Sequence, residues 1–253
     1  MGFGIGGILG LWQAVRARVW QIGGLFRYGA GRGLCNRSLA FLVLCGLCGG
    51  MALPKGAVAQ SIRVAVLGDS LTAGYGLAPQ EGLVAQLQAW LIAQGRGDVG
   101  VINAGVSGDT SAGGLARLGW TLADGVDGLI VALGGNDMLR GIDPGNTRAN
   151  LGQIVQQAQA QGVSVLLVGM QAPGNFGPDY KAAFDAIYPD LAAQYSVALM
   201  PGFFSALLQS GQGPGDILPL LQADGIHPNA VATGQIAAAV GPYVLALAAE
   251  AAR

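Results

Sequence analysis

The sequence predicts an α/β fold, in which a parallel sheet of five strands lies between layers of helices. Short apolar segments alternate with segments of helical periodicity along residues 62–253. The apolar segments do not alternate polar with apolar residues, so both faces of the sheet are expected to be buried. Strands joined by helices run parallel, and glycine and polar residues follow three of them at the edge where such sheets bind ligands.

Each predicted strand is a short run of β-branched or other apolar residues. Glycine follows the first strand at Gly68 and the third at Gly134, which ends the run in each case. In chain order, the strands are expected over 62–67, 99–102, 128–133, 163–168 and 196–200.

The segments between the strands carry apolar residues at the spacing of helices. Asn229 can cap a final helix that starts at Ala230, and Pro242 is expected to interrupt or kink it. The preceding helices are expected over 82–94, 115–122, 147–161 and 179–194.

The first 59 residues differ from the remainder in charge. They carry six basic residues and no acidic one, and the stretch 38–54 is uncharged and apolar. Ala57-Val58-Ala59 then matches the small-x-small pattern of a signal peptidase site. We therefore expect residues 1–59 to be an export leader and residues 60–253 to be one mature domain in the periplasm. An uncleaved membrane anchor is the alternative.

The expected mature domain is acidic, with seven basic and fourteen acidic residues. This balance argues against nucleic-acid binding and against electrostatic docking on membranes. All three cysteines lie in the leader, so the mature domain lacks a disulfide and a cysteine nucleophile. With one histidine and no cysteine, a zinc site is not expected there.

A set of polar residues at the predicted sheet edge fits acyl transfer. Ser70 follows the first strand, Asn136 follows the third, and Asp224 precedes His227, the chain's one histidine, by three residues. Serine needs a base to take its proton, and the base needs a third group to orient it. We expect Ser70 to attack, His227 to accept its proton and Asp224 to orient the imidazole.

The negative charge that develops in acyl transfer needs preplaced N–H donors. We expect these to be the backbone N–H groups of Ser70 and Gly108 and the side-chain amide of Asn136. Each residue also has a simpler explanation, since a lone histidine can be structural, a serine can cap a helix and an asparagine can stabilise a turn.

Other polar and aromatic residues near these positions are expected to be structural. Asp69 and Asp109 are expected to anchor loops by accepting backbone N–H bonds, and Asp137 is also assigned a structural role. Four aromatic residues are expected in the core rather than in a ligand site: Trp90, Trp120, Phe203 and Phe204.

Four sequence blocks together resemble the SGNH (GDSL) hydrolases, and within them the periplasmic thioesterase, lysophospholipase and arylesterase branch. The blocks are Gly68-Asp-Ser-Leu71, Ser107-Gly-Asp-Thr-Ser111, Gly134-Gly-Asn-Asp137 and Asp224-Gly-Ile-His-Pro-Asn229. The resemblance spans residues 62–240. It implies a flavodoxin-like three-layer α/β/α sandwich with strand order 2-1-3-4-5. It also implies hydrolysis of acyl esters or thioesters through an acyl-serine, without metal or cofactor.

The resemblance also implies roles for two loops. Gly105 and Gly108 both fall in the loop after the second strand, and motif alignment favours Gly108 as the oxyanion donor. The segment Met138–Asp143 matches a mobile loop beside the acyl pocket of the family. The residues expected to bind substrate are therefore Met138, Leu139, Arg140, Gly141 and Ile142.

The sequence leaves two other functions open. A carbohydrate esterase that deacetylates sugars would use the same residues on another substrate, and a flavodoxin-like module would bind a flavin or nucleotide at the same edge. For the leading hypothesis, the expected partner is a small acyl ester or thioester. No obligate protein partner is expected, and the protein should be a monomer.

Overall fold

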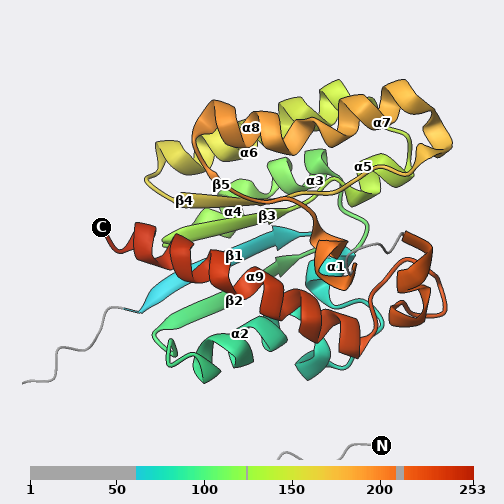
Figure 1. Ribbon diagram of the computed structural model, residues 1–253. Helices are drawn as coiled ribbons and strands as arrows, with labels where there is room; N and C mark the ends of the chain where they lie inside the picture. The colour runs from blue at the N-terminus through green and yellow to red at the C-terminus, as the bar shows by residue number, and fades with distance from the viewer. Residues whose placement is uncertain (1–60, 124, 209–213) are drawn as a thin grey trace, which may run out of the picture. The chain divides into compact units, whose positions relative to one another are not determined.

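The computed structural model describes residues 61–123, 125–208 and 214–253. The leader and the cleavage site predicted over 1–59 lie outside these residues and stay predictions. Figure 1 shows the described part as a sheet with helices packed on both sides.

All five predicted strands are present, and every pairing between them is parallel. Their order in the sheet is β2-β1-β3-β4-β5, which confirms the expected flavodoxin-like order. Because β1 lies beside both β2 and β3, the chain segments that leave these three strands emerge next to one another. The strands are β1 Ile62–Gly68, β2 Val99–Gly105, β3 Gly128–Ala132, β4 Ser164–Val168 and β5 Ala198–Met200.

The helices fill the segments between and after the strands. They are α1 Ser70–Ala73, α2 Leu83–Ala93, α3 Ser111–Ala116, α4 Leu118–Leu122, α5 Gly135–Leu139, α6 Pro144–Ala160, α7 Pro178–Asp185, α8 Ile187–Tyr195 and α9 Ala230–Ala251. Short 3₁₀ turns add η1 Pro79–Glu81, η2 Gly174–Phe176, η3 Phe203–Leu207 and η4 Pro214–Leu220.

The helices form two layers. On one face of the sheet, α9 packs against α2 and crosses several strands, while α6 and α8 cover the other face (Figure 1). Helix α9 is the one helix of the described chain that is long and apolar enough to span a membrane. Its buried residues, among them Ile236, Val240 and Val244, face the domain interior, as expected of a core helix.

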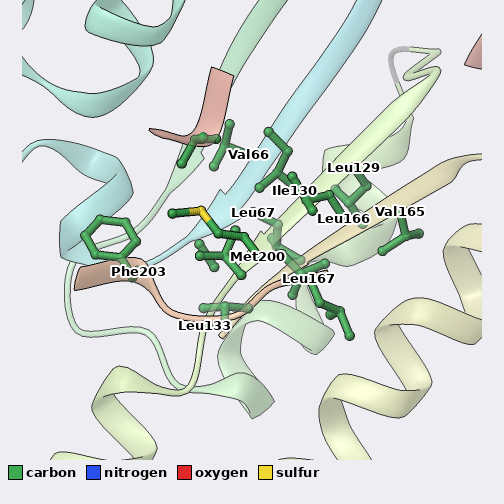
Figure 2. Packing of buried hydrophobic residues seen from close by; sticks show 14 of the residues in the cluster. Val66, Leu67, Leu129, Ile130, Leu133, Val165, Leu166, Leu167, Met200 and Phe203 are labelled. Atoms are coloured by element: carbon green, nitrogen blue, oxygen red, sulfur yellow. The ribbon is translucent and has the colours of Figure 1, made fainter. Parts of the chain in front are cut away.

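The core lies on both sides of β1, β3 and β4, whose side chains are almost fully buried. Figure 2 shows Leu67, Ile130 and Leu167 packed together with Met200 and Phe203 from the following segments. Each such side chain contributes about 1.5–3 kcal/mol by leaving water. The aromatic prediction was wrong for Trp120, which is 84% exposed. Helix α4, which carries Trp120, is a single short turn that covers β1 with its other residues.

Two predicted helices are divided in the structure. The helix expected over 115–122 starts earlier, because Thr110 caps α3 by accepting the N–H of Gly113, and it breaks at Arg117. The helix expected over 179–194 breaks at Ala186. Pro189 lacks the N–H that would bond to Asp185 four residues earlier, so one continuous helix would lose that bond.

Two further boundaries differ for local reasons. Helix α6 starts at Pro144 rather than at 147, because the Asp143 carboxylate caps it and proline is favoured in the first turn. Helix α9 continues without a break through Pro242, so the interruption that the sequence suggested is not observed. A Cβ on neighbouring Gly241 would lie 2.4 Å from the ring of Trp90, so α2 and α9 are in close contact here. This close packing against α2 stabilises α9 where Pro242 removes one of its backbone hydrogen bonds.

Candidate active site

The candidate nucleophile Ser70 lies at the carboxyl edge of the sheet, directly beyond β1. Asp69 follows the last strand residue and caps α1, with its Oδ1 accepting the N–H of Leu71 at 3.0 Å. Ser70 is thus the first residue of α1. The turn is tight, because a Cβ on Gly68 would lie 2.0 Å from Thr72 Oγ1. Glycine at 68 therefore lets the short helix fold back over the strand end.

The structure brings Ser70, His227 and Asp224 into one line of contacts. The Ser70 Oγ lies 2.8 Å from His227 Nε2, although the two residues are 157 positions apart. On the far side of the ring, Nδ1 lies 2.6 Å from Asp224 Oδ2. The tautomer that satisfies both contacts carries its proton on Nδ1, which leaves Nε2 free to accept the serine proton.

Asp224 also fixes the backbone of the turn that presents the imidazole. Its Oδ1 accepts the N–H of Ile226 at 2.9 Å and that of His227 at 3.0 Å. The backbone bond from His227, then that from Ile226, then the imidazole bond lower the pKa of Asp224 from its ordinary 3.8 to about 2. Asp224 is therefore a carboxylate at any pH at which the imidazole can act as a base.

Asn136 stands beside Ser70 on α5, directly after β3. Its Nδ2 donates to Asp69 Oδ2 at 3.2 Å, and the second hydrogen of the same amide is left for another acceptor. Asp69 is buried, and this burial raises its pKa despite the hydrogen bonds it accepts from Leu71 and Asn136. The predicted loop-anchoring role of Asp69 is confirmed, and Asp69 additionally orients Asn136.

The two glycines of the loop after β2 have different positions. Gly108 lines the pocket at Ser70 and has φ +84°, a conformation that favours glycine. Gly105 ends β2, and a Cβ there would lie 2.3 Å from the backbone nitrogen of Ala73, so Gly105 allows α1 to approach the sheet. Of the two, Gly108 is the one at the pocket.

The other two acidic residues of the blocks hold loops together. The Asp137 carboxylate accepts the N–H and hydroxyl of Ser111 and the hydroxyl of Thr147, as its structural assignment predicted. Asp109 was predicted to accept backbone N–H bonds. Its carboxylate instead pairs with the Arg117 guanidinium at 2.6 Å. The loop that carries Asp109 is thus anchored through the side chain of Arg117.

Arg117 is a structural residue of the site that sequence reasoning missed. Its guanidinium also donates to the carbonyls of Ala104 at 2.6 Å and Gly68 at 2.8 Å. It thereby joins the ends of β1 and β2, from which the serine and the glycine loop emerge. Arg117 directly follows α3, three residues after the pair Gly113-Gly114, and no local pattern predicts these contacts.

A pocket of about 310 Å³ opens at Ser70 and His227. Its wall is largely apolar, with Leu71, Met138, Leu139, Met170, Phe204 and Ile226 among the lining residues. Phe204 packs against the core, as expected, and also forms part of this wall. Met170 and Phe204 lie outside the four sequence blocks and Ile226 lies within the Asp224–Asn229 block, and none of the three was predicted to line a pocket.

Only part of the predicted substrate-binding segment lies on the pocket wall. Met138 and Leu139 line it, whereas Arg140, Gly141 and Ile142 do not. Arg140 donates to the carbonyl of Gly108 at 2.8 Å, and the Ile142 carbonyl accepts the Tyr180 hydroxyl at 3.0 Å. Gly141 has φ +62° and lies against the ring of Phe176. These three residues support the loop instead of facing the pocket.

Within the described ranges, no group of three or more histidine, cysteine or acidic side chains is placed to hold a metal ion.

Comparisons with known proteins agree with this geometry. Residues 66–232 match the GDSL-like lipase/acylhydrolase family. The chain is 44% identical to esterase TesA of Pseudomonas aeruginosa over 202 residues, which cover 79% of this chain and 96% of the relative. It is 41% identical to thioesterase 1/protease 1/lysophospholipase L1 of Escherichia coli (strain K12) over 165 residues, which cover 65% of this chain and 74% of the relative.

A solved structure extends the likeness to the fold. The psychrotrophic esterase EstA of a Pseudoalteromonas species, in a form inhibited by monoethylphosphonate, superimposes with a TM-score of 0.66 at 31% identity. The match covers 73% of this chain and 97% of EstA. The family match, these relatives and the serine block at the sheet edge lead to one conclusion. The chain belongs to the GDSL-like lipase/acylhydrolase family, the SGNH hydrolases that its sequence blocks resemble.

Proposed function

We propose that this protein is a serine esterase and thioesterase that cleaves acyl esters or thioesters through an acyl-serine on Ser70. The observation that carries the proposal is the line of contacts from Ser70 Oγ to His227 Nε2 at 2.8 Å and from Nδ1 to Asp224 at 2.6 Å. This line ends at the mouth of an apolar pocket of about 310 Å³. The related enzymes named above support the same reaction class.

In the acylation step, the Ser70 oxygen attacks the carbonyl carbon of the bound ester while its proton moves to His227 Nε2. Asp224, whose pKa of about 2 keeps it ionised, stabilises the imidazolium that forms. The imidazolium then gives the proton to the leaving alcohol or thiol as the bond to the acyl carbon breaks. In the second step, a water molecule attacks the acyl carbon while its proton moves to the same imidazole. The bond from the acyl carbon to Ser70 Oγ then breaks, the imidazolium returns the proton to Ser70, and the carboxylic acid is released.

The oxyanion of each tetrahedral intermediate needs donors on one side of Ser70. We assign these to the backbone N–H of Ser70, the backbone N–H of Gly108 and the Asn136 side-chain amide. First-turn N–H groups have no acceptor within their own helix, so the Ser70 N–H is available. The Asp69 bond to Asn136 Nδ2 fixes the plane of that amide, so its second hydrogen keeps one direction. Inhibition of the related EstA by a phosphonate, a tetrahedral phosphorus group, supports a tetrahedral intermediate.

The pocket wall favours an apolar acyl chain over a sugar. Leu71, Met138 and Phe204 offer apolar surface, whereas a bound sugar needs hydrogen-bonding groups around its hydroxyls. A carbohydrate deacetylase is therefore the second candidate, and the binding-module alternative fails to account for the aligned serine and imidazole.

A series of p-nitrophenyl esters from acetyl to dodecanoyl tests the proposal. Each buried CH₂ is worth about 0.8 kcal/mol, so kcat/KM should rise roughly fourfold per methylene until the pocket is filled. A fluorophosphonate probe should label Ser70, and Ser70→Ala should abolish both labelling and hydrolysis. A preference for acetyl esters and acetylated saccharides would instead support the carbohydrate esterase.

We further propose that residues 1–59 are cleaved on export and that the mature enzyme is a periplasmic monomer. The basic start, the apolar stretch and Ala57-Val58-Ala59 support this proposal. Mass spectrometry of the purified exported protein should find Gln60 at its N-terminus. An intact leader on membrane-bound enzyme would favour the anchor instead.

A further inference from the structure

The turn that presents His227 is connected to the segment that carries Ser70 by one side chain, Gln222. Its Nε2 donates to the carbonyl of Tyr75 at 2.8 Å, across 147 positions of sequence. The same Nε2 donates to the carbonyl of Pro228 at 3.0 Å, next to the imidazole. One amide group therefore contacts both sides of the Ser70–His227 pair.

The connection continues through backbone bonds on each side. Ser70 O accepts the N–H of Tyr75 at 3.1 Å, so the Tyr75 carbonyl is fixed relative to the serine. On the other side, the Gln222 backbone N–H donates to the carbonyl of His227 at 2.7 Å. A short chain of hydrogen bonds thus links the Ser70 peptide to the His227 peptide.

Other bonds fix the shape of the turn, and Asn229 ties its end to η4 by donating to the carbonyls of Leu220 and Pro219. Asp224 accepts backbone N–H groups within the turn, and the N–H of Gly225 donates to Gln222 O at 2.9 Å. Between the described segments 70–76 and 222–228, the hydrogen bonds are those of the Gln222 amide and the Ser70–His227 contact itself. Without the amide, the Ser70–His227 contact would be the one hydrogen bond left between these two described segments.

The segment that follows Ser70 is shaped to receive this amide. Gly76 has φ +74°, and a Cβ there would lie 2.1 Å from Gln222 Oε1. The absence of a side chain at 76 is what lets the amide lie flat against the loop. Tyr75, whose carbonyl the amide holds, places its ring 4.6 Å from the imidazole ring and covers one face of it.

We propose that Gln222 is a positioning residue for the hydrolysis, which sets the distance and angle between Ser70 Oγ and His227 Nε2. This inference rests on the assignment of Ser70 and His227 in the proposed function. It goes beyond that assignment by naming a residue that touches neither substrate nor the reacting atoms. Gln222 acts through its hydrogen bonds to the carbonyl of Pro228 in the His227 turn and to the carbonyl of Tyr75.

Gln222→Met tests the proposal, because methionine keeps the length of the side chain and removes both amide donors. Misplacing a catalytic group by about 1 Å can cost on the order of 100-fold. We expect kcat to fall by roughly 10- to 100-fold with KM changed less than about twofold. The rate of fluorophosphonate labelling should fall in parallel, since it needs the same proton transfer.

Gln159→Met is the matched control. Its Nε2 also donates to a backbone carbonyl, that of Tyr195 at 2.9 Å, at the end of α6 away from Ser70. Both variants should lower Tm by a similar small amount, and only Gln222→Met should lower kcat. Equal kcat losses in the two variants, or a kcat of Gln222→Met within twofold of the wild type, would overturn the proposal.

Two further variants distinguish failure of the positioning role of Gln222 from failure of the catalytic roles proposed for Ser70 and His227. If Ser70→Ala keeps full hydrolysis, the proposed function fails; if it is inactive while Gln222→Met is fully active, only the positioning role fails. Gly76→Ala forces a Cβ into the place of the amide, so it should lower kcat as well. In the double variant, the losses in kcat caused by Gly76→Ala and by Gln222→Met should be strongly non-additive, because both changes remove the same contact. Simple additivity of the two losses would contradict this shared contact.

Discussion

The serine side and the histidine side of the active site are built differently. Ser70 follows a central strand, and its neighbour Asp69 is buried, with a pKa raised by that burial. His227 lies on a turn between η4 and α9, and its partner Asp224 has a pKa lowered to about 2 by backbone N–H groups of that turn. The serine side is thus fixed by the core, and the histidine side by local hydrogen bonds. Substitutions on the serine side should therefore lower both stability and activity, whereas those on the histidine side should lower activity with little change in stability.

The largest effect on activity is expected on the histidine side. His227→Ala removes the base and should lower kcat by roughly 10⁴-fold or more. Since the turn keeps its backbone bonds to Asp224, the free energy of unfolding should change by less than about 1 kcal/mol. Steady-state kinetics and urea unfolding of the same preparation check both values. A variant that retained a tenth of wild-type kcat would remove His227 from the mechanism.

A smaller loss is expected for Asn136, the proposed oxyanion donor on the serine side. Asn136→Ala removes a group that acts on the transition state, so kcat should fall by about 10²- to 10³-fold with little change in KM. It also leaves buried Asp69 Oδ2 without the Asn136 bond, so stability should fall too. Asn136→Asp, which lacks the amide donor, should be at least as inactive. A rise in KM alone would argue that Asn136 binds substrate and not the oxyanion.

The largest loss in the free energy of unfolding is expected for a substitution at Arg117. Arg117→Met removes its ion pair with Asp109 and its bonds to the ends of β1 and β2, and should cost about 2 kcal/mol. The matched control is Arg148→Met, because the Arg148–Asp190 pair is more exposed, with side chains 39% and 54% accessible. That change should cost less than about 1 kcal/mol. Urea midpoints of the two variants provide the comparison, and equal losses would contradict it.

The smallest effect concerns pH. The folded-state pKa of Asp224 is depressed from 3.8 to about 2, so its ionised form stabilises the fold above pH 3.8. This contribution should be lost as pH falls from 3.8 through 2. The difference in Tm between wild type and Asp224→Asn should therefore shrink as pH falls from 3.8 toward 2. A difference that grew on acidification would reverse the sign of the assigned interaction.

The sequence predicted the sheet, and it brought together the candidate residues at its edge, because both have local patterns. Apolar runs that end in glycine marked the strands to within a few residues, and β2 continued three residues beyond the predicted Ile102. The blocks marked Ser70, Asn136 and His227, and the parallel sheet implied that they share an edge. Pocket residues Met138 and Leu139 followed from the same motif.

The supporting residues were not predictable, because their partners are far away in the sequence. The bonds of Arg117 to Gly68 and of Gln222 to Tyr75 span 49 and 147 positions. Nothing in the local sequence around either residue distinguishes it from a solvent-exposed side chain. The prediction for Trp120 was wrong for the opposite reason. An aromatic residue in an apolar helix suggests burial, but the short α4 turns this side chain toward solvent.

The position of α9 at the end of the chain has a consequence for biosynthesis. The turn that carries His227 is fixed between η4 and this helix, and α9 packs across the finished sheet and onto α2. A polypeptide that emerges N-terminus first therefore exposes Ser70, the proposed nucleophile, long before His227, its proposed base, has been made. Under the proposed mechanism, a chain truncated before His227 should not hydrolyse esters.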